Sequence, residues 1–206
     1  MHPLYLHTTK MKRETIMKKL NTLLVLLTFA GSALAQTPWT VDKAHSKIGF
    51  NVDHMVVAEV DGNFKDFEGK VVTKSPDFNG ADVEFVAKVA SINTDNEKRD
   101  GHLKSDDFFN AEKYPDLKFK GKLVKEGEKY FLRGDLTIRD VTKPVTLDVT
   151  YGGTVKVGPG EKAGFKLNGK INRQDYGLKW SKTTEAGGLV VSDEVELIGK
   201  IELNKG

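Results

Sequence analysis

The sequence contains no cysteine among its 206 residues. This absence excludes disulfide bridges, thiolate nucleophiles, cysteine-ligated zinc and iron–sulfur clusters. Catalytic signatures are lacking as well, because the chain has no G-x-S-x-G or H-E-x-x-H sequence, no P-loop and no dinucleotide-binding fingerprint. The sequence therefore predicts no cofactor and no resident metal, and it does not favour an enzyme.

Long apolar runs are also lacking. The apolar run over residues 20–30 is too short to cross a bilayer, which takes roughly 20 residues. It follows Lys18 and Lys19 and precedes Ala33-Leu34-Ala35, which is the order of a secretory signal peptide. We predict an N-terminal extension and a signal peptide over residues 1–35, cleaved after Ala35, and a mature periplasmic domain over 36–206. Residues 1–16 are either a mis-assigned start or an unusually long first region of the signal.

The positive net charge of the chain comes from residues 1–35. The whole chain has 32 Lys and Arg against 29 Asp and Glu, a formal charge of +3. Without residues 1–35 the counts fall to 27 and 28, a formal charge of −1. A nearly neutral chain is poorly suited to nucleic acid, which binds to basic faces. We predict no nucleic-acid partner and no membrane span.

The chain does have a persistent alternation of apolar and polar residues, typical of strands with one buried and one solvated face. The alternation covers residues 48–53, 83–89, 117–123, 130–136, 145–151, 165–171 and 195–203. A further strand is expected over 60–73, broken at Gly62 and Gly69, and turns are expected at 125–128, 152–153, 158–160 and 187–188. Residues 96–104 and 172–180 break the period. The pattern predicts an all-β fold, an eight-stranded antiparallel barrel with one or two short helical segments.

The inward side of this barrel supplies the candidate ligand-binding residues. A barrel of about eight strands is either filled by its own side chains or holds one ligand. Interior Gly121, Gly134, Gly169 and Ala87 remove side-chain volume, which favours space for an apolar guest. A packed core accounts for the same pattern equally well. The apolar candidates are Phe50, Phe64, Phe67, Phe85, Phe108, Phe119, Leu132, Leu147, Phe165 and Leu167.

Three polar residues are candidates for contacting a head group at the barrel mouth: Arg99, His102 and Arg173. Arginine offers a planar fork of donors for such a group. The alternative is structural, with Arg99 paired to Asp100 and Arg173 to Asp175 so that each ion pair fixes its connecting segment.

The histidines leave two further alternatives open. His45, His54 and His102 would form a metal site if a strand and a loop brought them together, but hydrogen-bonded residues at the barrel rim are the simpler interpretation. An enzyme of the isomerase or cyclase type, acting on a lipid, would use His54 or His102 as its acid or base.

Several motifs, taken in order along the mature chain, resemble the YceI-like family of bacterial lipid- or polyisoprenoid-binding proteins. The segments that carry the resemblance are 39–46, 60–64, 67–69, 90–94, 98–109, 134–145 and 171–178. The one departure noted is Asp140, where the family more often has glycine in a turn.

The resemblance implies a lipocalin-like barrel in the periplasm that holds a long-chain isoprenoid or other amphiphilic lipid, as a carrier or by sequestration. It implies no enzymatic activity and no metal. A homodimer through the barrel mouth is compatible with it, and so is the rival view of a packed barrel that serves as a structural or stress-associated interaction protein.

Overall fold

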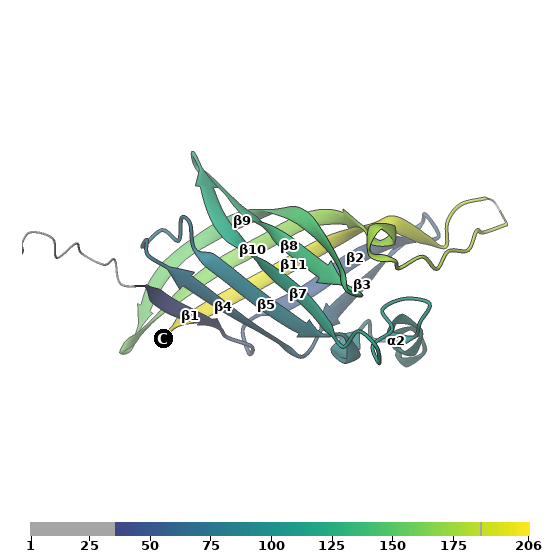
Figure 1. Cartoon of the computed structure of the whole chain (residues 1–206), viewed down its shortest axis with the longest axis horizontal. Coiled ribbons are helices and arrows are strands. Elements are labelled where there is room, and N and C mark those ends of the chain that lie inside the picture. Colours follow the sequence, from purple (N-terminus) through teal and green to yellow (C-terminus); the bar gives the residue numbers. More distant parts are fainter. Residues whose placement is uncertain (1–35, 186) are drawn as a thin grey trace, which may run out of the picture. The chain divides into compact units, whose positions relative to one another are not determined.

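The structure is a computed structural model that describes residues 36–185 and 187–206. The predicted extension and signal peptide, residues 1–35, lie outside the described residues. The described part forms one antiparallel sheet of 11 strands that closes on itself (Figure 1). None of its helices has the length and apolar character needed to span a bilayer.

The strands are β1 (Thr37–Val41), β2 (Lys47–His54), β3 (Ala58–Phe64), β4 (Phe67–Thr73), β5 (Asp82–Lys88), β6 (Ile92–Asn93), β7 (Asp116–Glu126), β8 (Lys129–Ile138), β9 (Val141–Val157), β10 (Gly160–Asn172) and β11 (Val191–Lys205). The helical segments are α2 (Glu97–Lys104) and the 3₁₀ helices η1 (Val89–Ser91) and η2 (Arg173–Tyr176). The helical segment expected over 96–104 is confirmed, with the Asn96 side chain accepting a hydrogen bond from the Arg99 backbone N–H.

The 11 strands make the eight walls of a barrel. Strand β11 pairs with β1 near its end and with β2 along its first part. Strand β4 pairs with β1, and β3 pairs with β2. Next along the sheet, β5 pairs with β4 and β6 pairs with β3. Thus β1 and β2, β3 and β4, and β5 and β6 are each one wall interrupted by a kink, and β7 to β11 complete the ring. The predicted eight-stranded antiparallel barrel is confirmed.

The expected break of the second wall at its glycines is wrong. The chain leaves the sheet at residues 65–66 instead, so that Phe64 and Phe67 both point inward and are buried. Gly62 stays within β3 because its missing side chain makes room for a ring: a Cβ there would lie 2.2 Å from Cζ of Phe50. The glycine marks a close contact between neighbours and not the end of a strand.

The turn expected at residues 152–153 is also wrong. Strand β9 continues to Val157, and its pairing with β10 shifts register between Gly164 and Phe165. Gly153 has a φ of 100°, which only glycine adopts readily. The glycine pair therefore forms a bulge that bends a long strand.

One end of the barrel is closed by an aromatic plug, made of Trp39, Phe78, Tyr130, Tyr151 and Phe165. Phe78 comes from the loop between β4 and β5 and is 1% exposed. Its ring centroid lies 5.1 Å from that of Trp39 and 5.1 Å from that of Phe165, which stacks on Tyr151 at 4.9 Å. Contacts of this kind add to the free energy gained by burying the rings.

The opposite end, here called the mouth end, carries α2, η2, residues 177–185 and 187–190, and the β2–β3 hairpin (Figure 1). Arg139 joins two of these pieces. It donates hydrogen bonds to the Phe108 carbonyl at 2.8 Å and to the Gly177 carbonyl at 3.0 Å. The connecting segments at this end are therefore held by polar contacts to backbone.

Candidate functional site

An apolar cavity of about 220 Å³ lies inside the barrel. It extends from Leu123 and Phe165 beside the aromatic plug to Leu178 and Arg173 at the mouth end. Its wall is almost entirely aliphatic and aromatic, because the inward-facing residues of nearly every strand contribute to it. A cavity of this kind takes an apolar group and offers no hydrogen-bonding partner to a polar one.

The structure brings together all the apolar candidates except Phe67. Those that line the cavity are Phe50, Phe64, Phe85, Phe108, Phe119, Leu132, Leu147, Phe165 and Leu167. Phe67 is buried in a smaller cluster with Ala87 and Ile92, and its ring lies 6.0 Å from that of Phe85. It therefore packs inside the barrel beside the lining residues without lining the cavity itself.

The candidates chosen from the sequence did not include Leu103 and Phe109, which are among the lining residues at the mouth end. Both belong to the irregular stretch in and after α2, where no period of two marks an inward position. The Phe109 ring meets Phe64 edge to face with the centroids 6.2 Å apart. Leu103 is the only apolar residue of α2, so this helix has no apolar face that could have marked it in the sequence.

The interior glycines do not leave empty space themselves, which corrects the expectation from the sequence. Gly121 and Gly134 face each other across β7 and β8, and a Cβ on either would lie 2.8 Å from Cζ of Phe119. A Cβ on Gly169 would lie 2.4 Å from a methyl of Leu147. The glycines let larger neighbours lie flat against the wall, and this keeps the centre of the barrel open.

Arg173 reaches the end of the cavity with its donors already engaged. Its guanidinium donates to the carbonyls of Leu178, Trp180 and Ser192 and to the Asp193 carboxylate at 2.9 Å. The predicted partner Asp175 is not among these acceptors. Burial lowers the pKa of Arg173 from its ordinary value. We therefore assign Arg173 to holding the mouth segments together.

Arg99 and His102 lie outside the cavity lining. Arg99 donates to the Thr94 hydroxyl and carbonyl, both at 2.8 Å, and Asp100 accepts from the Thr94 backbone N–H and hydroxyl. Helix α2 is thus fixed through Thr94. The structure shows hydrogen bonds of Arg99 and Asp100 to Thr94 where the sequence suggested an ion pair between Arg99 and Asp100.

His102 joins α2 to the segment after η2. Its Nε2 lies 2.8 Å from an Asp107 carboxylate oxygen. Its ring is perpendicular to those of Phe108 and Trp180, with centroids 5.0 and 5.3 Å away. Because Phe108 lines the cavity, His102 and Trp180 cover the outer side of the cavity wall.

Comparison with known proteins assigns the barrel. The family model of the YceI-like domain matches residues 39–203. The chain belongs to the YceI-like family. A UPF0312 protein of Photorhabdus laumondii is 42% identical to it over 158 residues, 75% of this chain and 82% of the relative. A UPF0312 protein of Staphylococcus aureus is 34% identical over 170 residues, 82% of this chain and 98% of the relative.

Solved structures share the fold. The YceI protein of Campylobacter jejuni is 40% identical, with a TM-score of 0.65 over 79% of this chain and 95% of that one. BcnA of Burkholderia cenocepacia is 24% identical, with a TM-score of 0.66 over 79% and 98%. A polyisoprenoid binding domain from Saccharophagus degradans is 16% identical, with a TM-score of 0.58 over 80% and 97%. The last two likenesses concern the fold alone.

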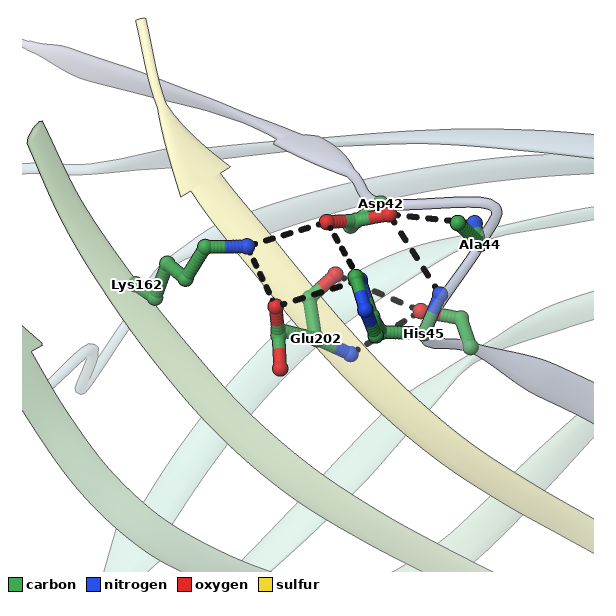
Figure 2. A network of polar contacts seen from close by, with 6 residues as sticks. Asp42, Ala44, His45, Lys162 and Glu202 are labelled. Atoms are coloured by element: carbon green, nitrogen blue, oxygen red, sulfur yellow. Dashed lines mark hydrogen bonds and ion pairs between the residues drawn. The ribbon is translucent and has the colours of Figure 1, made fainter. Parts of the chain in front are cut away.

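The metal site of His45, His54 and His102, weighed as an alternative from the sequence, is not formed by the described residues of this YceI-like barrel. Within residues 36–185 and 187–206, the only group with metal-ligand geometry is Asp42, His45 and Glu202, whose ligand atoms lie within 4.8 Å of one another. His54 and His102 take no part in it. Figure 2 shows that the ammonium group of Lys162 binds both carboxylates of this group, 3.0 Å from Asp42.

This network fixes the kink between β1 and β2. Asp42 accepts hydrogen bonds from the His45 ring at 3.0 Å and from the Ala44 backbone N–H at 3.0 Å (Figure 2). The hydrogen bonds from His45 and Lys162 hold the pKa of Asp42 well below its ordinary value. A lysine already supplies the positive charge between the carboxylates, so the cluster is explained as a structural tie between β1, β10 and β11.

Proposed function

We propose that the cavity binds the apolar chain of an isoprenoid or other amphiphilic lipid, and that the protein carries or sequesters this lipid. The observation that supports the proposal is the apolar space of about 220 Å³ inside the barrel. Transferring a lipid chain from water into such a space yields about 0.8 kcal/mol for each methylene group. No polar group of the guest would find a partner there, so its head group stays at the mouth end.

The size of the cavity sharpens the proposal. An apolar cavity of about 150 Å³ accepts benzene, whereas sites for larger molecules usually measure roughly 300–1,000 Å³. The space of about 220 Å³ therefore takes one end of a chain as it stands. A longer guest requires rings such as Phe50, Phe64 and Phe109 to turn aside, and we expect loading to be slow for that reason.

A solved structure with the same fold supports the proposed class of ligand. The Saccharophagus degradans protein with the same barrel is described as a polyisoprenoid binding domain. The chemistry of the present cavity is suited to the same class of ligand, because branched apolar chains pack well against aromatic and aliphatic walls.

A catalytic role has less support. An isomerase or cyclase would need an acid or base facing the bound chain. None of the described residues that line the cavity is a histidine, and the guanidinium of Arg173 is engaged by backbone carbonyls and Asp193. Glu84 contributes to the wall, but its carboxylate is exposed and paired with Lys120 at 2.9 Å. We therefore propose a binding protein.

Extraction and titration test the proposal. Protein purified without added lipid is extracted with organic solvent, and the extract is analysed by mass spectrometry for isoprenoid or fatty chains. Stripped protein is then titrated with geranylgeraniol. The proposal predicts a lipid in the extract and saturable binding of one molecule per chain. Absence of both results would refute it.

A blocking variant locates the site. Leu197→Trp adds volume to a residue of β11 that lines the cavity. It is expected to weaken geranylgeraniol binding by more than about tenfold, or about 1.4 kcal/mol. Lys200→Trp places the same ring on the exposed face of β11 and is the matched control. Equal affinities of the two variants would place the binding site elsewhere.

Periplasmic location is part of the same proposal, since residues 18–35 have the order of an export signal. Cell fractionation with N-terminal sequencing tests it. The expected result is a periplasmic protein that starts at Gln36. A cytoplasmic protein that retains residues 18–35 would contradict it.

A further inference from the structure

The β2–β3 hairpin exposes apolar side chains at its tip. Met55, Val56 and Val57 are 46%, 76% and 88% exposed, and Leu189 of the adjacent segment is 36% exposed. We call these four residues the apolar tip. Single exposed apolar residues are common on protein surfaces, but three in succession on a projecting turn are a recognition feature.

The backbone of this turn would favour different residues. Met55 and Val56 have φ angles of 53° and 66°, and the Val57 N–H donates to the His54 carbonyl at 3.3 Å. Two central residues with positive φ are typical of a type I′ turn, which prefers Asn-Gly. A β-branched valine is strained there. The apolar side chains therefore make the turn less stable, and their presence indicates a role outside folding.

The apolar tip lies directly beyond the cavity wall. The Met55 N–H donates to the Val190 carbonyl at 3.0 Å, and the Val190 N–H donates to the Lys182 carbonyl at 2.8 Å. Val52 and Val191, a few residues below the tip, both line the cavity. The tip thus belongs to the mouth end, on the side where the head group of a guest would remain.

Two lysines and a tryptophan lie on the segment beside the tip. Lys179 and Lys182 are exposed on the adjacent segment, and the Lys182 ammonium lies 5.8 Å from the ring centroid of half-buried Trp180. Apolar side chains flanked by lysine and tryptophan are typical of segments that lie at a bilayer interface. Acidic Asp53, Glu59 and Glu185 are also exposed near the tip, with Asp53 opposite Glu59 in the hairpin, so the preference for anionic lipid is expected to be moderate.

We propose that the apolar tip inserts into the surface of a lipid bilayer and holds the mouth end of the barrel against it. The two lysines then meet anionic head groups, and a lipid chain can pass between bilayer and cavity without crossing water. The loading role rests on the proposed function, whereas the membrane contact itself does not.

The small size of the tip argues against a protein partner. A stable interface takes roughly 800 Å² from each protein, far more than the four side chains of the apolar tip present. A bilayer needs no complementary surface, because its acyl region accepts any apolar group that reaches it.

Co-sedimentation with vesicles tests the proposal in the absence of any isoprenoid. The protein is mixed with vesicles of phosphatidylethanolamine and phosphatidylglycerol and centrifuged. The double variant Met55→Asn, Val56→Gly supplies the residues that the turn prefers, so we expect a higher unfolding temperature together with a more than roughly tenfold loss of vesicle binding. A rise in stability excludes misfolding as the cause of that loss.

Matched variants complete the design. Val155 and Val157 near the β9–β10 hairpin, at the plugged end, are 59% and 50% exposed, and their replacement by threonine is expected to leave vesicle binding unchanged. Lys182→Ser is expected to weaken binding to anionic vesicles about fivefold and to leave binding to zwitterionic vesicles unchanged.

The proposal is overturned if the wild type stays in the supernatant, or if the Met55→Asn, Val56→Gly variant sediments like the wild type. A dimer that forms without lipid and is lost in that variant would also overturn it, in favour of a second copy of the chain. Geranylgeraniol titration of the variant separates the two proposals: retained affinity together with lost vesicle binding supports both. Vesicle binding by a protein that takes up no lipid would support the membrane contact and refute the carrier.

Discussion

The two ends of the barrel are stabilised in different ways. At the plugged end, rings from the four strands β1, β8, β9 and β10 pack with Phe78 of the β4–β5 loop, which is 1% exposed. At the mouth end, Arg139 and Arg173 bind backbone carbonyls of segments without regular structure. Apolar packing fills the plugged end. Hydrogen bonds to backbone hold the mouth end in shape without filling it, and this leaves one end of the cavity suited to the passage of a guest.

Removing the plug tests this contrast most severely. Phe78→Ala is expected to lower the free energy of unfolding by about 3–5 kcal/mol, because a fully buried ring is lost and a void remains. Urea denaturation measures the change. The variant also opens the second end, so we expect faster release of bound geranylgeraniol in a stopped-flow chase. An unchanged release rate would show that guests leave through the mouth end alone.

The corresponding change at the mouth end is Arg173→Ala. It leaves several backbone carbonyls without their donor and Asp193 without its charge partner, and we expect a loss of about 2–3 kcal/mol in the free energy of unfolding. The matched control is Arg133→Ala, which removes an exposed pair with Glu126 and should change stability by less than about 1 kcal/mol. Equal effects of the two substitutions in urea denaturation would contradict the role assigned to Arg173.

The wall between the two ends is tested by Gly134→Ala. The added Cβ would lie 2.3 Å from the Lys120 carbonyl oxygen and 2.8 Å from Cζ of Phe119. We expect a loss of about 1–2 kcal/mol from overpacking. The added Cβ would also push the Phe119 ring toward the centre of the cavity. We expect this displacement to weaken geranylgeraniol binding. Gly164→Ala is the control, because no heavy atom lies within 4 Å of its added Cβ. Similar thermal stability and affinity of both variants would refute this account.

The smallest expected effect concerns the tie at the β1–β2 kink. The pKa of Asp42 is lower in the folded chain than in the unfolded chain, where it is about 3.9. Its contribution to stability is therefore complete above that value and is lost as the pH falls toward the folded pKa. Asp42→Asn should flatten the decline in unfolding temperature between about pH 5 and pH 2. Asp148→Asn on the exposed face of β9 is the control, and a wild-type slope in both variants would contradict the prediction.

The barrel could be predicted because its walls have one wet and one buried face. Each uninterrupted strand, such as β7 or β10, carries a strict alternation that follows from local backbone geometry. The kinks could not be predicted in the same way. Phe64 and Phe67 both face inward although they are three residues apart, because the chain takes an extra residue at the break. An alternation with a period of two does not reveal where an extra residue is inserted.

The sequence predicted which residues line the cavity but not that a cavity exists. Alternation identified Phe50, Phe119 and Leu147 as inward residues, but the same alternation describes a filled core. Whether space remains depends on how Phe119 lies across Gly121 and Gly134, and this is decided by packing across strands. The partner of Arg173 was misjudged for a related reason. Asp175 is near in sequence, whereas Asp193 is brought near by the fold.

The sequence by itself determined the family, the closed antiparallel barrel and the face on which most residues lie, because these depend on local periodicity and ordered motifs. Only the tertiary structure decided that the barrel contains a cavity, that arginines hold the mouth end, and that Met55, Val56 and Val57 form an exposed tip. These features depend on distances between residues far apart in the chain. Side-chain packing and hydrogen bonding across the barrel set those distances, and no local pattern encodes them.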